Sequence, residues 1–478
     1  MRSRVALLAL AATGVFTPLA FAGGVTAIFC NITGLPTNGV PTIGGDFALG
    51  TTSSSAFDRP FLSPDGTRWI IGAIQEAGTD DKDIVIIGGG QTSAGSSTVA
   101  VEDSPTSFDP SRTYDSIRTG MGITNSGRYV FGANISGTTT DDELLVLFNG
   151  ATQTVPIREG QVSPIAGQNF GATIDSAHIL NDETPRYHAV MTPTTTKQML
   201  GSGASIISES AVTIPGSQLV APAQSIGSFT VEQFGSSADG SHHIYSASLA
   251  GPTTSNNIFV VDGNVVVQEG ANLPGGVLAG TNVGTISVTS TDRLGVMSPS
   301  GGHWAARFSM NDGVGAANQT DVVLRDGQVA AKTDSPLFTG SGDLWDDTPF
   351  STTFFLQTIN DNGEMVIGGL TNVGNVDKDA KLVYLAPDGT GFVLATEGDP
   401  IDLDGNGLYD DNAYIDVFGN DDGVLSNDGH FYFVAAIQND QNVSIGNAFL
   451  TIAVPEPGSS LALLSAAALA GVRRRRRV

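Results

Sequence analysis

The sequence is short of cysteine and of basic residues, and both shortages limit what the protein can be. Its one cysteine, Cys30, cannot form an intramolecular disulfide, so the chain must fold around an apolar core, for which 478 residues suffice. We expect Cys30 to be a small buried side chain. Lys and Arg number 22 against 48 Asp and Glu, giving a formal net charge of −26. A protein with this much negative charge repels nucleic acid and anionic lipid surfaces, so we expect no nucleic-acid partner.

The sequence also lacks three common catalytic and phosphate-binding motifs. Its six histidines are scattered, and none belongs to an H-E-x-x-H pattern. There is no G-x-S-x-G elbow and no phosphate-binding glycine loop with its Lys. The sequence therefore predicts no catalytic residues and no organic cofactor.

The N-terminus has the layout of a secretory signal peptide. Arg2 and Arg4 precede an apolar stretch that ends near Leu19, and Ala20-Phe21-Ala22 follows as an A-x-A cleavage site. We therefore expect residues 1–22 to be removed by cleavage after Ala22. An uncleaved N-terminal membrane anchor is the alternative, but the apolar run is short.

A short phrase recurs about every sixty residues along the rest of the chain. It reads LSPDGTRW at Leu62 and INDNGEMV at Ile359, and its second slot is always Ser, Thr or Asn. The seven second slots are Ser63, Thr124, Asn181, Ser237, Ser298, Asn360 and Ser426. Polar residues and Gly between β-rich runs are typical of a hairpin turn, and this period indicates an array of supersecondary units.

A second hairpin turn follows the phrase in five of the copies. These turns are Gly89-Gly90, Asn149-Gly150, Asp262-Gly263, Asp326-Gly327 and Asp388-Gly389. Two hairpins give four strands per repeat, so the sequence predicts an all-β fold, a seven-bladed β-propeller of four-stranded blades over residues 23–453. The seventh repeat runs out before its fourth strand, and we expect an N-terminal strand within residues 26–40 to close the last blade. A β-solenoid or a string of small sandwiches is the alternative.

The best local motif for a ligand is DLDGNGLYDD, which begins at Asp402. Asp402, Asp404, Asn406 and Asp410 hold positions 1, 3, 5 and 9 of a calcium loop, and the Leu408 carbonyl would be the position 7 ligand. The pattern resembles the calcium loops of EF-hand, dockerin and thrombospondin-type sites. It departs from the EF-hand at position 12, where no Glu stands and where Asp411 or Asp416 would have to substitute. We expect Ca²⁺ here in a structural role; a solvated acidic turn is the alternative.

Acidic residues also recur in two other slots of the repeat. Paired acids precede third strands at Asp80-Asp81, at Asp141-Asp142 and at Asp377 with Asp379, whereas Glu102, Glu159, Glu269 and Glu397 follow fourth strands. Equivalent slots share one rim of a propeller and could gather cations, but we expect charges that keep strand edges soluble. Catalysis by a carboxylate pair would require one raised pKa and a close approach, which spacing alone does not establish.

The C-terminus combines a triplet, an apolar run and a basic tail. The triplet is Pro455-Glu456-Pro457, residues 459–472 are apolar, and the tail is Arg473, Arg474, Arg475, Arg476 and Arg477. Together, residues 454–478 resemble the PEP-CTERM sorting signal of exported bacterial proteins. The resemblance implies processing by an exosortase in a Gram-negative-type bacterium and a link with the cell surface and the exopolysaccharide matrix of biofilms. The arginines fit the cytoplasmic side of a transient inner-membrane anchor, the chain's only membrane contact.

These observations favour an exported, non-catalytic protein of the cell surface or extracellular matrix. Its propeller would present loops to a glycan, such as extracellular polysaccharide, to a surface protein or to a cation. The alternative is a secreted glycan-active enzyme, a lyase or hydrolase, because propellers host both kinds of function. Converging acids, His or Arg at the mouth of the central channel would favour the enzyme.

Overall fold

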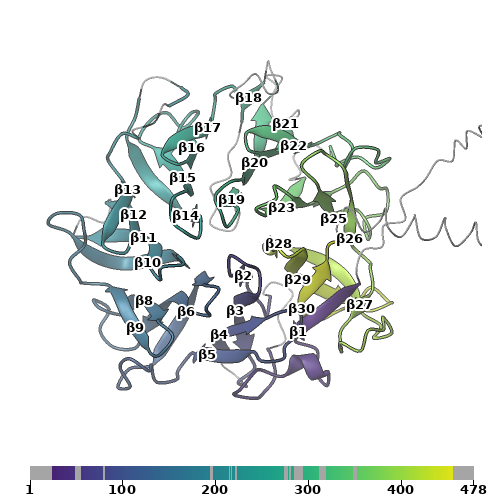
Figure 1. Cartoon of the computed structure of the whole chain (residues 1–478), viewed down its shortest axis with the longest axis horizontal. Coiled ribbons are helices and arrows are strands. Elements are labelled where there is room, and N and C mark those ends of the chain that lie inside the picture. Colours follow the sequence, from purple (N-terminus) through teal and green to yellow (C-terminus); the bar gives the residue numbers. More distant parts are fainter. Residues whose placement is uncertain are drawn as a thin grey trace, which may run out of the picture.

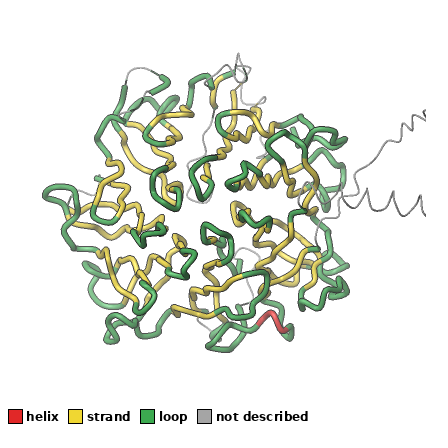
Figure 2. The backbone as a smooth tube through the Cα atoms, viewed as in Figure 1, coloured by secondary structure: helices red, strands yellow, loops and turns green. Residues whose placement is uncertain are grey.

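The strands of the protein form a ring of small sheets. The computed structural model describes residues 24–48, 55–78, 81–193, 197–214, 216, 218–220, 223–273, 278, 281–284, 294–311, 319–347 and 353–455. Within these ranges seven antiparallel sheets surround a central axis (Figure 1). The only helix in the described ranges is the short 3-10 turn η1 (Pro36–Asn38) (Figure 2). The structure confirms the prediction of a seven-bladed, all-β propeller.

Each blade runs outward from the central axis in chain order. Blade 1 comprises β2 (Phe61–Leu62), β3 (Arg68–Gln75), β4 (Lys82–Gly89) and β5 (Ser97–Val101). Blade 2 comprises β6 (Tyr114–Ile123), β7 (Tyr129–Ile135), β8 (Glu143–Phe148) and β9 (Gln153–Arg158). Blade 3 comprises β10 (Asn169–Ile179), β11 (Pro185–Thr192), β12 (Gln198–Ser202) and β13 (Ser205–Glu209). Blade 4 comprises β14 (Ile226–Ser236), β15 (His243–Leu249), β16 (Asn257–Val261) and β17 (Asn264–Gln268).

The remaining blades follow the same plan with two variations. In blade 5, β18 (Asn282–Val283) and β19 (Gly295–Met297) both pair with β20 (Trp304–Asn311), which β21 (Gln319–Arg325) and β22 (Gln328–Lys332) follow. Blade 6 comprises β23 (Phe354–Ile359), β24 (Met365–Leu370), β25 (Ala380–Leu385) and β26 (Gly391–Thr396). Blade 7 comprises β28 (Tyr414–Leu425), β29 (His430–Gln438), β30 (Ser444–Ala453) and β1 (Val25–Cys30), with the short β27 (Ile401–Asp402) outside it.

The recurring phrase forms the turn between the first two strands of every blade. Ser237 is fully buried. Its hydroxyl accepts a hydrogen bond from His242 N at 3.0 Å and donates one to Asp239 at 2.7 Å. The equivalent hydroxyls of Ser63, Thr124, Ser298 and Ser426 and the amide oxygen of Asn360 also accept a backbone N–H across the turn. The Ser, Thr or Asn at the second position of the phrase therefore closes the turn and has a structural role. Asn181 differs from the others because it is exposed.

Neighbouring phrase turns are joined to one another around the central axis. Backbone or side-chain hydrogen bonds link Asp65 to Asn125, Asn181 to Ala238, Ala238 to Pro299, Ser300 to Asp361, Asp361 to Asn427 and Asn427 to Pro64. Blades 2 and 3 are joined instead by an ion pair, Arg128 Nε to Glu183 Oε1 at 3.1 Å. The seven turns thus form a continuous rim at one end of the propeller.

The N-terminal strand closes the ring, as predicted. β1 pairs antiparallel with β30, with Thr26 opposite Thr451 and Cys30 opposite Ala448, and so occupies the outer position of blade 7. We call this pairing of β1 with β30 the seam of the ring. Asn31 reinforces the seam, since its side-chain oxygen accepts a hydrogen bond from Asn447 N at 2.7 Å. Cys30 is buried, and this burial raises the pKa of its thiol. A blade assembled from both ends of the chain leaves no gap in the ring.

The apolar core lies between the blades and not in the middle of the ring. Seven clusters of buried side chains each join the facing sheets of two neighbouring blades. Between blades 7 and 1, Phe29 of β1 packs against Trp69 of β3 with ring centroids 5.8 Å apart, and Phe449 packs on the same indole at 5.3 Å. The central axis is left to the edges of the innermost strands.

Candidate functional sites

The central cavity opens among the phrase turns. It has a volume of about 190 Å³ and is lined by residues from the innermost strands or phrase turns of all seven blades. Most of the lining is glycine, serine or apolar, and the described part of it contains no carboxylate. Arg59 and His178 are its only ionisable side chains within the described ranges. Of the groups whose convergence would favour an enzyme, the described lining thus contains one Arg and one His but no acid.

A polar network lies further along the inner strands, away from the phrase turns. Arg307 of β20 forms a two-armed ion pair with Asp421 of β28, at 2.8 and 2.6 Å, and also donates to Gln357 of β23 at 2.9 Å. Gln357 in turn donates to Leu294 O, whose own N–H donates to Gln233 in the cavity lining. Both charged side chains are at most 10 % exposed. This network connects blades 4 to 7 at the inner end of the cavity.

The Glu residues that follow fourth strands fold back onto the third strand of their own blade. Glu102 Oε2 accepts the N–H of Asp83 at 2.9 Å, and Glu269 Oε2 accepts that of Asn257 at 3.4 Å. Burial and the neighbouring Asp142 raise the pKa of Glu159 to about 7. None of these Glu side chains lines the cavity, so the raised pKa of Glu159 belongs to the framework of the blades.

Burial, together with nearby Asp379 and Asp416, also raises the pKa of Glu397 to about 7. Glu397 and Glu159 hold the same position, directly after the fourth strand, in different blades. Glu269 holds it in a third blade, and its pKa is also raised, mainly by burial. Desolvation of a repeated framework position explains all of them without a catalytic role.

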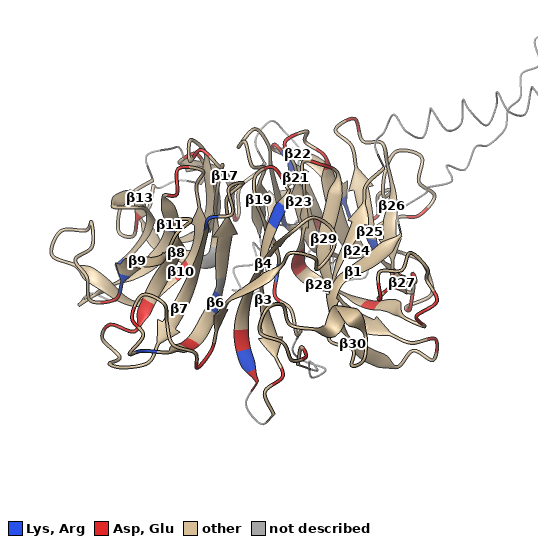
Figure 3. Cartoon of the chain, turned by 60° about the horizontal axis from the view of Figure 1, so that its bottom comes forward, with Lys and Arg blue, Asp and Glu red and all other residues tan. Residues whose placement is uncertain are grey.

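The paired acids before the third strands have a mixture of surroundings. Asp141 accepts from Arg112 Nη1 and from Arg158 Nη2, both at 3.0 Å, and so bridges two arginines. Asp377 accepts from Asn442 across blades 6 and 7 at 3.5 Å. Asp80 lies outside the described residues. Figure 3 shows many Asp and Glu positions in loops and at strand ends. The paired cations of Asp141 speak against a common cation site on this rim.

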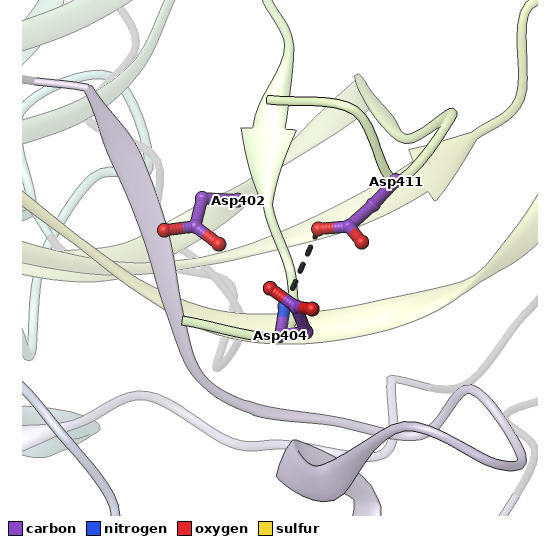
Figure 4. Close-up of side chains that lie close together, drawn as sticks. All are labelled: Asp402, Asp404 and Asp411. Carbon is purple, nitrogen blue, oxygen red and sulfur yellow. Dashed lines mark hydrogen bonds between the residues drawn. The ribbon is translucent and has the colours of Figure 1, made fainter. Parts of the chain in front are cut away.

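The predicted calcium loop brings three carboxylates together. Asp402, Asp404 and Asp411 each offer an oxygen atom, and these atoms lie within 4.8 Å of one another (Figure 4). Asp410, predicted as the position 9 ligand, is exposed and lies outside this group, while Asp411 takes part in it. Asn406 donates from its side chain to Asp404 at 2.9 Å, and the Leu408 side chain is exposed. Sequence spacing had offered Asp411 only as a substitute for the missing position 12.

Backbone N–H groups hold this loop in shape. Asp402 is 2 % exposed and accepts hydrogen bonds from the N–H groups of Gly405, Asn406 and Gly407. Asp411 Oδ2 accepts the N–H of Leu403 at 2.7 Å. Among the described residues, no Lys, Arg or His forms an ion pair with the three carboxylates. Hard oxygen donors with this excess of negative charge suit Ca²⁺.

The loop is attached directly to the seam of the ring. Its first strand, β27, pairs parallel with β1, with Val25 opposite Ile401 and Thr26 opposite Asp402. The Thr37 hydroxyl donates to Leu403 O at 2.7 Å and lies 3.2 Å from the Cys30 sulfur. Any change in the shape of the loop therefore acts on the strand that closes blade 7.

Most of the predicted processing signals lie outside the described residues. These are Ala20 and Ala22 of the signal peptide, Glu456 and Pro457, the apolar segment 459–472 and the five arginines 473–477; Pro455 is described. Within the described part of the chain, no helix is both long and apolar enough to span a membrane.

Three solved structures resemble the chain with low sequence identity and low TM-scores. Prolyl oligopeptidase B from Galerina marginata is 10 % identical with a TM-score of 0.34, and the match covers 83 % of this chain and 49 % of that one. Sqt1 from Chaetomium thermophilum is 10 % identical with a TM-score of 0.34 over 82 % and 84 % of the two chains. A subtype N10 neuraminidase-like protein of A/little yellow-shouldered bat/Guatemala/060/2010 is 10 % identical with a TM-score of 0.31 over 70 % and 94 %. The chain thus spans about half the length of the oligopeptidase.

The C-terminus gives a clearer result. No curated protein matches the chain. Residues 453–477, however, match the family model of the PEP-CTERM protein-sorting motif. This motif signals export, anchoring of the C-terminus in the membrane and processing by an exosortase. The chain therefore carries a PEP-CTERM protein-sorting motif directly behind a seven-bladed β-propeller.

Proposed function

We propose that the protein is a non-catalytic binding protein of the cell surface or extracellular matrix. The observation that carries this proposal is the position of the sorting motif. The last strand, β30, ends at Ala453, where the matched motif begins, so the propeller is complete before the processed segment. Removal of that segment leaves every blade intact.

The central cavity supports a binding role over an enzymatic one. Glycan hydrolysis generally needs two carboxyl groups across the scissile bond, and the described cavity lining has none. A rigid ring with loops at both ends suits recognition, because loops held by a firm scaffold commonly carry binding residues. Extracellular polysaccharide or another surface protein is the partner class we propose.

Localisation and binding can be tested separately. In the native bacterium, we expect the wild-type protein in the surface or matrix fraction, and a Pro455→Ala/Glu456→Ala/Pro457→Ala variant to be retained with the inner membrane. Purified mature protein should bind isolated matrix polysaccharide without shortening it. Equal distribution of wild type and variant, or release of oligosaccharides by the purified protein, would contradict the proposal.

We further propose that Ca²⁺ binds the Asp402 loop and stabilises the seam. Asp402 and Asp404, with Asp411, would be the carboxylate ligands, and the bound ion would offset the repulsion between them. Because β27 pairs with β1, a ligand that binds only the folded loop stabilises the closed ring. We expect chelation to lower the melting temperature of the wild type and to leave an Asp402→Ala variant unchanged. An Asp440→Ala variant, at an exposed acid elsewhere in blade 7, is the control.

A further inference from the structure

We infer that the central cavity binds a small monocarboxylate, such as the terminal uronic-acid unit of a polysaccharide, through Arg59. This inference rests on the proposed binding role and names the ligand class of the cavity. It starts from an arginine whose surroundings differ from those of all other described arginines.

Arg59 lacks the partners that arginine normally has. Nine arginines lie in the described ranges, and eight of them donate hydrogen bonds to a carboxylate, a side-chain amide or a backbone carbonyl. Arg59 donates none, and its Nε is buried without an acceptor. Its two Nη groups also make no hydrogen bond and are not buried, so they are the donors that remain open to an acceptor supplied by a ligand.

The guanidinium group of Arg59 is nevertheless held in place. Its central carbon lies 4.7 Å from the centroid of the Phe61 ring, and both residues line the cavity. Asp58, the neighbouring acid, is not among the lining residues, and its carboxylate lies over Gly72 of β3. A planar guanidinium that is stacked on one face keeps its N–H groups in plane for a carboxylate.

The rest of the lining limits the ligand to one negative charge. Arg59 is the one permanently cationic side chain in the described lining, and the whole chain carries a formal charge of −26. A dianionic phosphate would bring one more negative charge than the site can neutralise. Phe61 and Phe234 offer apolar surface, while Ser236 and Thr358 already form hydrogen bonds, Ser236 with His178 at 2.7 Å and Thr358 with the N–H of Leu425 at 3.1 Å.

The depth of the cavity selects the end of a chain. Along β28, the cavity lining begins at Val424, whereas Asp421, three residues earlier, is buried in the ion pair with Arg307. A volume of about 190 Å³ above this network has room for one small unit. A single terminal sugar acid therefore fits better than an internal segment.

Calorimetric titration of the mature protein with sodium glucuronate tests this inference. We expect saturable binding, with much weaker binding of glucose, which lacks the carboxylate, and of inorganic phosphate. Arg59→Gln should weaken glucuronate binding by about 10- to 100-fold, because hydrogen bonds to charged groups contribute about 1.5–3 kcal/mol. Arg59→Lys keeps the positive charge but loses the paired N–H groups of the guanidinium, so it should weaken glucuronate binding less than Arg59→Gln does. Arg68→Gln, an exposed arginine on the next strand of blade 1, should bind like wild type.

Clear results would overturn the assignment. These are no binding of glucuronate, equal binding of glucose or phosphate, or wild-type affinity in Arg59→Gln. The melting temperatures of the Arg59 variants, measured beside that of the wild type, separate loss of binding from loss of fold. The titration does not depend on where the protein resides, so the inference can fail while the surface role holds, and the reverse.

Discussion

Truncation of Phe29 tests whether the N-terminal strand holds the ring shut. Phe29 is 1 % exposed and packs against Phe47 and Trp69, with ring centroids 5.3 and 5.8 Å away. Phe29→Ala removes on the order of 150 Å² of buried aromatic surface, which at about 25 cal/mol per Å² contributes ~4 kcal/mol. Measured losses for buried Phe→Ala substitutions, about 3–5 kcal/mol, agree with this figure. We expect a matching loss in the free energy of unfolding, measured by urea denaturation followed by tryptophan fluorescence.

A matched variant separates closure of the ring from ordinary core packing. Phe259 is also 1 % exposed and packs against Trp304, but at the interface between blades 4 and 5. Phe259→Ala should cost a similar free energy, whereas only Phe29→Ala should make residues 24–48 an early site of thermolysin cleavage under native conditions. A loss below about 1 kcal/mol in Phe29→Ala, or equal protection of the N-terminus in both variants, would refute the reasoning.

Three further predictions concern the framework. Burial raises the pKa of Glu159 from 4.5 to about 7, so the folded state prefers the protonated form, and stability should fall as the pH rises from about 4.5 to 7 and then level off. Glu159→Gln should abolish this fall. At pH 8 the variant should be more stable than wild type by about 1–2 kcal/mol, which is less than the ~3 kcal/mol that the full shift represents because solvent screens part of the charge. Parallel pH profiles of the two proteins would contradict this. Ser237→Ala should lower the free energy of unfolding, measured by urea denaturation, by about 1–2 kcal/mol. Asn181→Ala changes the equivalent but exposed position and should lower it by less than about 0.5 kcal/mol. Equal losses in the two variants would contradict the structural role of this position. Asp402→Ala should abolish the effect of chelation on the melting temperature. If chelation does not change the melting temperature of the wild type, the proposed calcium site is wrong.

The fold was predictable because each blade repeats the same local chemistry. A turn such as that at Ser298 needs a buried polar acceptor and a residue with positive φ, and Gly301 supplies that conformation at φ 78°. These demands are met within a few residues, so they leave a periodic mark on the sequence. The missing strand of the seventh repeat was equally visible, since β1 and β17 follow the same apolar pattern.

The central cavity was less predictable because its residues meet only in three dimensions. Arg307 and Asp421 are 114 positions apart in different blades, and neither stands in the repeated phrase. Asp421 reaches its partner from an irregular stretch of β28 between Phe418 and Gly423, where it adopts a positive φ of 59°. Spacing predicts strands and turns, but it does not predict which side chain an irregular strand directs to the axis.

The seam of blade 7 also sets the order in which the protein can fold. Asn31 and Asn447, which are hydrogen-bonded across it, are 416 positions apart. A chain that is exported from its N-terminus delivers β1 first and β30 last, and contacts so distant along the chain form slowly. Until β30 arrives, the edge of β1 that pairs with it stays open. Since β30 ends where the sorting motif begins, the last step of folding awaits the final residues before the membrane-held segment. The last blade is therefore completed at the point of the chain where the sorting motif begins.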